Sequence, residues 1–82
     1  MGSFNYVIKD EVGMHARPAG MLVKLAKELS GAVTITKGER TVEATKLLAI
    51  MSLGVKKGEE ITVSADSDED LEKLKEFFEA NL

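Results

Sequence analysis

The 82 residues of this chain are enough for one small domain, and we expect residues 1–82 to form a single one. The sequence has no cysteine and one histidine, which excludes disulfides and thiolate metal sites, and we expect no metal ion or other cofactor. The net charge of −3, the lack of a basic stripe and the lack of a long apolar run predict no nucleic-acid binding, no membrane insertion and a cytoplasmic location.

The first part of the chain predicts a strand followed by a helix. Residues 4–9 alternate well enough for a strand with its apolar side chains on one face. A helix is predicted over residues 16–29 and stops before Gly31, a typical glycine signal at a helix end. Its apolar arc consists of Ala19, Leu22, Val23, Leu25, Ala26 and Leu29. Its opposite side consists of Gly20, Lys24, Lys27 and Glu28.

The rest of the chain predicts a hairpin, a short helix, a strand and a final helix. Thr45 is expected to cap the short helix, and Ser67 the final one. The predicted elements are strands over 32–36, 40–44 and 60–65, a helix over 46–53 and a helix from 68 onward. Two β-α-β halves of this kind predict an α+β fold, an antiparallel sheet with helices on one face.

The single histidine lies in a motif that is suited to holding a phosphate. Pro18 fits the first turn of the predicted helix, so His15 falls at or just before its cap. The backbone amides of Ala16 and Arg17 then belong to the positive end of a helix dipole and predict an anion site. Arg17 adds a permanent charge, and a neutral imidazole is a nucleophile. The alternative is that His15 is an ordinary exposed loop residue or a satisfied cap.

The short helix is apolar around most of its circumference. Ile50 and Leu53 point in one direction, whereas Leu47, Leu48 and Met51 point roughly in the other. One set should be buried and the other partly exposed, and an exposed apolar cluster usually marks a binding surface. The alternative is a helix that is buried completely in a tight core. For Lys24 and Lys27, the alternative to binding is an ordinary solvated helix face.

Taken together, these motifs resemble those of one family, the histidine-containing phosphocarrier (HPr) family of the bacterial sugar phosphotransferase system. The resemblance covers essentially the whole chain and is carried by Gly13–Ala19, Ile50–Gly54, Lys57-Gly58 and Ile61–Ala65. It implies an open-faced β-sandwich, with a four-stranded antiparallel sheet and three helices on one face, in the order β-α-β-β-α-β-α.

The resemblance also implies a function and its residues. His15 would accept a phosphoryl group on Nδ1 from phosphorylated enzyme I and pass it to sugar-specific IIA proteins or domains, while Arg17 neutralises the phosphate. The chain would thus be a carrier and not an enzyme with turnover of its own, and we expect a monomer. The implied docking surface for donors and acceptors consists of Ala16, Gly20, Lys24, Lys27, Leu47, Leu48 and Met51.

The chain departs from one pattern within the family. Many members from low-GC Gram-positive bacteria carry a regulatory serine at the cap of the second helix, and Lys46 occupies that position here. We therefore expect no regulation of the serine type and no partnership with the transcription regulator that recognises the phosphoserine form. Two other functions stay open: a paralogue in a regulatory, nitrogen-type phosphorelay, and a non-catalytic interaction module whose histidine is incidental.

Overall fold

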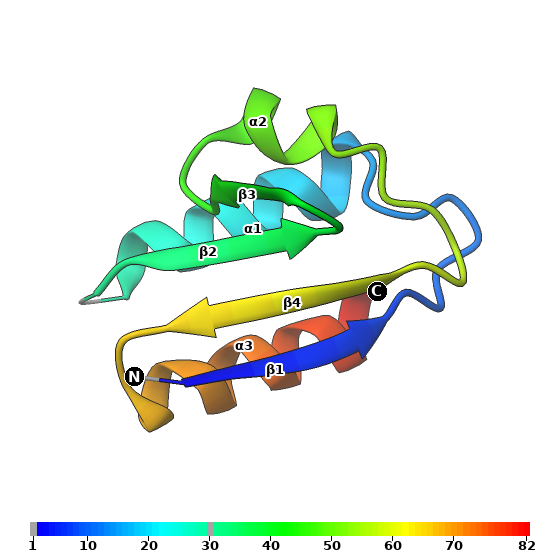
Figure 1. Cartoon of the computed structure of the whole chain (residues 1–82). Helices are drawn as coiled ribbons and strands as arrows, with labels where there is room; N and C mark the ends of the chain where they lie inside the picture. The colour runs from blue at the N-terminus through cyan, green and yellow to red at the C-terminus, as the bar shows by residue number, and fades with distance from the viewer. Residues whose placement is uncertain (1, 30) are drawn as a thin grey trace.

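The molecule is built on a twisted antiparallel sheet, and all three helices pack on one face of that sheet (Figure 1). The computed structural model describes residues 2–29 and 31–82. The strands β1 (Gly2–Val7), β2 (Val33–Lys37), β3 (Arg40–Glu43) and β4 (Glu60–Ala65) lie in the order β1-β4-β2-β3. The helices are α1 (Ala16–Glu28), α2 (Leu47–Ser52) and α3 (Asp68–Asn81). The predicted α+β fold and its element order are therefore confirmed.

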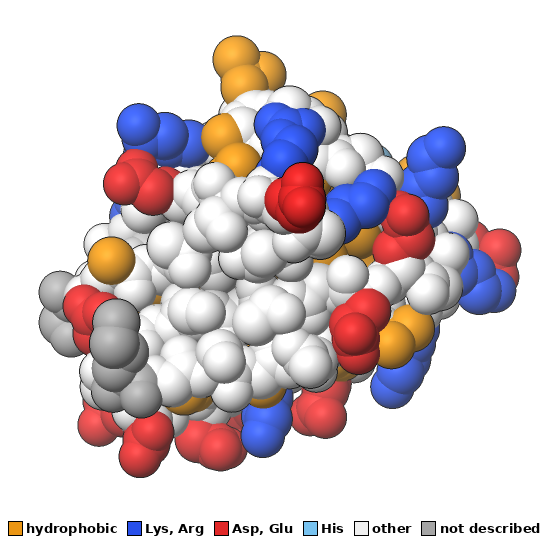
Figure 2. All heavy atoms as spheres, in the orientation of Figure 1, with side chains coloured by type: hydrophobic (Ala, Val, Ile, Leu, Met, Phe, Trp, Pro, Cys, Tyr) orange, Lys and Arg blue, Asp and Glu red, His pale blue; other side chains and the backbone are white. Residues whose placement is uncertain are grey.

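Alternation along the strands separates a core face from an open face. Val63 of β4 pairs with Phe4 of β1 on one side and with Ile35 of β2 on the other, so apolar side chains line up across the sheet. The positions between them are polar, and the Thr62 hydroxyl donates a hydrogen bond of 2.8 Å to the Asn5 side chain. The open face is accordingly mostly white in Figure 2, with charged side chains around its rim.

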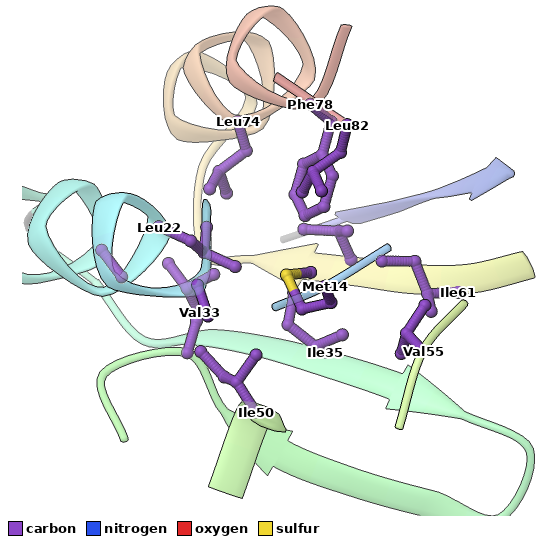
Figure 3. Close-up of a cluster of buried hydrophobic side chains, with 14 of the residues drawn as sticks. Met14, Leu22, Val33, Ile35, Ile50, Val55, Ile61, Leu74, Phe78 and Leu82 are labelled. Atoms are coloured by element: carbon purple, nitrogen blue, oxygen red, sulfur yellow. The ribbon is translucent and has the colours of Figure 1, made fainter. Parts of the chain in front are cut away.

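The core lies between the sheet and the helices (Figure 3). α3 contacts β1 and β4, while α1 contacts both α2 and α3. Phe78 of α3 is fully buried and lies 5.4 Å from the Tyr6 ring, measured between centroids. The Tyr6 hydroxyl donates to the Phe78 carbonyl at 3.0 Å. Burial raises the pKa of Tyr6, and Glu79 raises it further.

Several predicted boundaries differ from the structure by one or two residues, since β2 is Val33–Lys37, β3 is Arg40–Glu43 and α2 is Leu47–Ser52. β1 begins at Gly2 and ends at Val7, two residues earlier than predicted at each end. α1 stops before Gly31 as predicted, but it ends at Glu28, one residue early, and the backbone at Leu29 is extended. Gly31 allows a close approach, because a Cβ atom there would lie 2.4 Å from a carboxylate oxygen of Asp66. That carboxylate accepts the Ala32 amide at 3.0 Å.

The cap of α2 also differs from the prediction. Lys46 is the N-cap residue and its side chain forms no capping hydrogen bond, so the expected role of Thr45 as the cap was wrong. The Lys46 amide bonds to the Glu43 carbonyl at 3.2 Å, which shows that the turn from β3 places Lys46 at the helix start. The other end is held by cations, as suits the negative end of a helix dipole. Lys37 Nζ donates to the Leu53 carbonyl at 3.1 Å, and Arg40 donates to the Ser52 carbonyl at 2.9 Å.

Candidate functional site

His15 is the N-cap residue of α1, as the sequence predicts. Its backbone is extended, with φ −92° and ψ −175°, and its carbonyl accepts the Ala19 amide at 3.0 Å. The imidazole does not fold back to cap the helix, and its side chain is 41% exposed. The imidazole is therefore presented to solvent from a fixed backbone position at the start of a helix.

The first turn of α1 has the charge distribution that favours binding of an anion. Its residues, all of which the structure describes, include no acid, and the His15 side chain does not cap the amides of Ala16 and Arg17. Uncapped amides at the positive end of a helix dipole attract an anion. Arg17 is exposed, and Pro18 and Ala19 are buried beneath it, so the guanidinium projects from an anchored turn.

The loop before His15 is shaped by Gly13. This glycine has φ +82°, in the left-handed region, and a Cβ atom there would lie 2.5 Å from the Val55 carbonyl. The neighbouring Met14 amide donates to the same carbonyl at 3.0 Å, and the Met14 side chain is buried in the core. The glycine and the buried methionine together fix the loop against the segment between α2 and β4, and so fix the position of His15.

A pocket of about 240 Å³ adjoins the imidazole. His15 and Arg17 both line it, which brings together the two residues to which the sequence assigned the chemistry. Part of its wall comes from the last turn of α3. The remaining lining residues are Asp10, Pro18, Met21, Ala80 and Asn81. The end of α3 is fastened to the loop, since the Leu82 carbonyl accepts the backbone amides of Lys9 and Asp10.

Asp10 is a charged pocket residue that sequence reasoning missed. Its carboxylate oxygen Oδ2 lies 3.7 Å from His15 Nε2. The same oxygen accepts the amides of Val12 and Gly13, each at 3.1 Å. An aspartate followed by a glycine three residues later is a recognised turn pattern, so a local signal for this turn did exist. That the turn faces the imidazole could not be read from the sequence.

The predicted docking residues lie on two helices that contact each other. On α1, Ala16, Lys24 and Lys27 are exposed and Gly20 is half-buried. On α2, Ile50 is fully buried, whereas Leu48 is 80% exposed and Leu47 and Met51 are each 38% exposed. Hydrophobic side chains are visible over α2 at the top of the molecule in Figure 2. The alternative that α2 is completely buried is therefore wrong.

Met21 was not among the predicted surface residues. It is 43% exposed and lines the pocket beside His15 and Arg17. It lies four residues after Arg17 on α1, a spacing that places two side chains on the same helix face. This spacing is the signal that could have identified it.

Within residues 2–29 and 31–82, none of the helices is long and apolar enough to cross a membrane.

Known proteins match nearly the whole chain. Residues 3–80 match the family model described as "PTS HPr component phosphorylation site". Over 69 residues the chain is 38% identical to the phosphocarrier protein HPr of Mycoplasma capricolum, covering 84% of this chain and 78% of that protein.

Solved structures of HPr proteins have the same fold. HPr-C-His from Thermoanaerobacter tengcongensis superposes with a TM-score of 0.90 at 34% identity, over 98% of this chain and 93% of that chain. An HPr dimer from the same organism has a TM-score of 0.64 at 34% identity, covering 93% of this chain and 94% of that one. The family match and these relatives show that the chain belongs to the HPr family of phosphotransferase system proteins.

Proposed function

We propose that this chain is a phosphocarrier that accepts a phosphoryl group on Nδ1 of His15 from phosphorylated enzyme I and passes it to IIA proteins or domains. One observation carries the proposal: the partly exposed imidazole of the N-cap residue of α1 shares a pocket with Arg17. Membership of the HPr family supports the same conclusion.

The transfer needs positioning and charge stabilisation more than any other chemistry. The Nδ1 lone pair attacks phosphorus, and the bond from phosphorus to the donor's leaving atom breaks with its electron pair remaining on the donor. Arg17 and the amides of Ala16 and Arg17 stabilise the charge on the phosphoryl oxygens. The same steps in reverse order deliver the group to the acceptor, so the chain needs no turnover of its own.

Donor and acceptor would dock on the surface formed by α1 and α2. Leu47, Leu48 and Met51 supply an apolar patch, and Lys24 and Lys27 supply charge. A small interface of this composition suits transient binding to more than one partner, since charged rims speed association and small buried areas permit release. We propose that the chain acts as a cytoplasmic monomer, a state that light scattering in solution can measure.

The experiment is phosphorylation in solution. The chain is incubated with enzyme I, magnesium and phosphoenolpyruvate, and its intact mass is measured. We expect one added phosphoryl group that is labile in acid and is absent from His15→Ala. A IIA protein added afterwards should remove the group. No mass increase with active enzyme I, or an equal increase in His15→Ala, would refute the proposal.

We also propose that the chain lacks regulation of the serine type. Lys46 stands at the N-cap of α2, its side chain is 67% exposed, and Nζ lies 3.5 Å from a carboxylate oxygen of Glu43. A lysine cannot accept a phosphate from a serine kinase, and the hydroxyl of Thr45 lies one residue earlier. The kinase that modifies the serine of relatives should therefore add no acid-stable phosphate. Stable phosphate on Thr45 would overturn this expectation.

A further inference from the structure

The carboxylate of Asp10 faces one particular nitrogen of the His15 ring. Oδ2 lies 3.7 Å from Nε2, and both side chains are partly exposed, 34% for Asp10 and 41% for His15. The nitrogen that receives the phosphoryl group in the proposed function is the other one, Nδ1. The two ring nitrogens therefore have different surroundings, with a negative charge beside the one that does not react.

Asp10 is held in place without any help from His15. Its Oδ2 accepts the amides of Val12 and Gly13, and its own amide donates to the Leu82 carbonyl at 2.9 Å. The carboxylate is thus fixed by backbone from the loop and from the end of α3. A group fixed in this way loses little freedom when the imidazole changes its protonation or binds a phosphoryl group.

We propose that Asp10 is a positioning residue that keeps the imidazole proton on Nε2 and so leaves the Nδ1 lone pair free to attack phosphorus; this inference rests on the proposed function. A neutral imidazole carries one proton, on either nitrogen, and only the unprotonated nitrogen is a nucleophile. A carboxylate beside Nε2 favours the form that carries its proton there. The opposite tautomer would be unreactive at Nδ1.

The same carboxylate assists the step itself. When Nδ1 bonds to phosphorus, the Nε2 proton stays on the ring, and the ring becomes more positive as the donor's bond breaks. Asp10 stabilises this charge from the side away from the phosphorus. Its own charge is partly offset by the two amides it accepts, and Arg17 in the same pocket faces the incoming oxygens with the opposite sign.

The test variant is Asp10→Asn, which removes the charge but keeps an oxygen that can accept the amides of Val12 and Gly13. Asp10→Ser is a second variant, because its hydroxyl can form a similar turn. The control is Glu11→Gln, which removes a charge from the same loop. The Glu11 carboxylate pairs with Lys57 at 2.8 Å, which leaves Asp10 as the acid beside the imidazole.

Two readouts are needed. The first is the pair of ¹⁵N chemical shifts of the His15 ring, measured near pH 8.5, where a free imidazole is neutral, because these shifts report the tautomer directly. The second is the rate of phosphorylation by enzyme I. We expect Asp10→Asn to shift population toward the Nδ1-protonated form and to slow transfer roughly threefold to fivefold, the range set by a partly exposed charge pair. Glu11→Gln should change neither.

The outcomes separate this inference from the proposed function. Ring shifts that are the same in wild type, Asp10→Asn and Asp10→Ser overturn the tautomer role, whatever the phosphorylation result. A changed tautomer with an unchanged transfer rate overturns the role in transfer. If the wild-type chain takes up no phosphate, the proposed function fails, and the ring shifts still decide whether Asp10 sets the tautomer.

Discussion

His15 illustrates how little a single residue reveals without its surroundings. A histidine just before a helix with proline in its first turn could have only the structural role of an N-cap, or it could be a nucleophile. The structure shows that its imidazole does not cap the helix and stands beside a guanidinium and a carboxylate in one pocket. Each neighbour has a distinct effect, because Arg17 favours an added anion and Asp10 favours a proton on Nε2.

Arg17→Ala is predicted to slow phosphorylation by enzyme I by about tenfold or more, since a charge-assisted hydrogen bond to phosphate is worth roughly 1.5–3 kcal/mol. The free energy of unfolding should stay within about 0.5 kcal/mol of wild type, because the side chain is exposed. Initial phosphorylation rates and urea unfolding measure the two effects. Lys73→Ala, on α3 and not among the residues that line the pocket, is the control. Equal rates for Arg17→Ala and wild type would remove the assigned role.

Glu59 gives the stability a predictable dependence on pH. The hydrogen bond from Lys37, at 3.0 Å, and that from the Lys56 amide, at 2.8 Å, lower its pKa below the ordinary value of 4.5. A lowered pKa in the folded state stabilises the protein fully above the unfolded value, and this stabilisation is lost as pH falls through the folded value.

Lys37→Met should therefore raise the Glu59 pKa back toward 4.5, as followed by NMR titration of the carboxyl carbon. Glu59→Gln should make the free energy of unfolding less dependent on pH in the acid range. Glu39→Gln, in the exposed turn between β2 and β3, is the control for the loss of an acid. A Glu59 titration that is the same in wild type and Lys37→Met would contradict the assignment.

At the scale of elements, α2 is a short helix with one side buried in the core and the other side exposed. Ile50 is completely buried and packs in the core, while Leu48 on the other side is 80% exposed. Its last carbonyls are bound by Lys37 and Arg40, from the two strands of the hairpin. A six-residue helix is too short to be stable alone, so these contacts and the burial of Ile50 hold the exposed patch in place.

Substitutions on the two sides of α2 should therefore have opposite effects. Leu48→Glu is expected to weaken binding to enzyme I while changing the free energy of unfolding by less than about 0.5 kcal/mol. Ile50→Ala should cost about 2–5 kcal/mol of stability through loss of buried volume. Titration calorimetry and urea unfolding measure the two quantities, and Met51→Glu is a second test of binding. If Leu48→Glu binds as tightly as wild type, this patch does not dock the donor.

At the scale of the whole molecule, three segments distant in sequence meet around the site. The loop before α1, the segment between α2 and β4 and the end of α3 are joined by hydrogen bonds through Met14, Val55 and Leu82. These same three residues are buried, so the site sits on the edge of the hydrophobic core. Figure 1 shows the C-terminus lying beside these two loops at one end of the sheet.

Gly13→Ala is predicted to destabilise the whole molecule more than Gly38→Ala does. Both glycines have positive φ, +82° and +61°, but only at Gly13 would a Cβ atom collide with backbone, at 2.5 Å from the Val55 carbonyl. The left-handed conformation alone costs about 1–2 kcal/mol, and the collision adds to it. Urea unfolding of the two variants measures the difference. Equal losses in the free energy of unfolding would show that the Gly13 loop can move away from the Val55 carbonyl without an energetic cost.

Local signals account for most of what the sequence predicted correctly. The element order, the strand faces, the cap at Ser67 and the placement of His15 at a helix start all follow from periodicity and from the backbone chemistry of a few neighbours. The wrong prediction, the cap at Thr45, was also local. It failed because the turn after β3 places Lys46 at the start of α2.

The sequence by itself therefore determined the fold class, the two sides of α2 and the placement of His15 and Arg17 at the start of α1, because each depends on local spacing. Only the tertiary structure decided that Asp10 faces Nε2 of His15 and that the last turn of α3 walls the pocket. The α3 wall comes from the opposite end of the chain, and Asp10 is fixed there by the bond of its amide to the Leu82 carbonyl. No local pattern records which distant segments a folded core brings together.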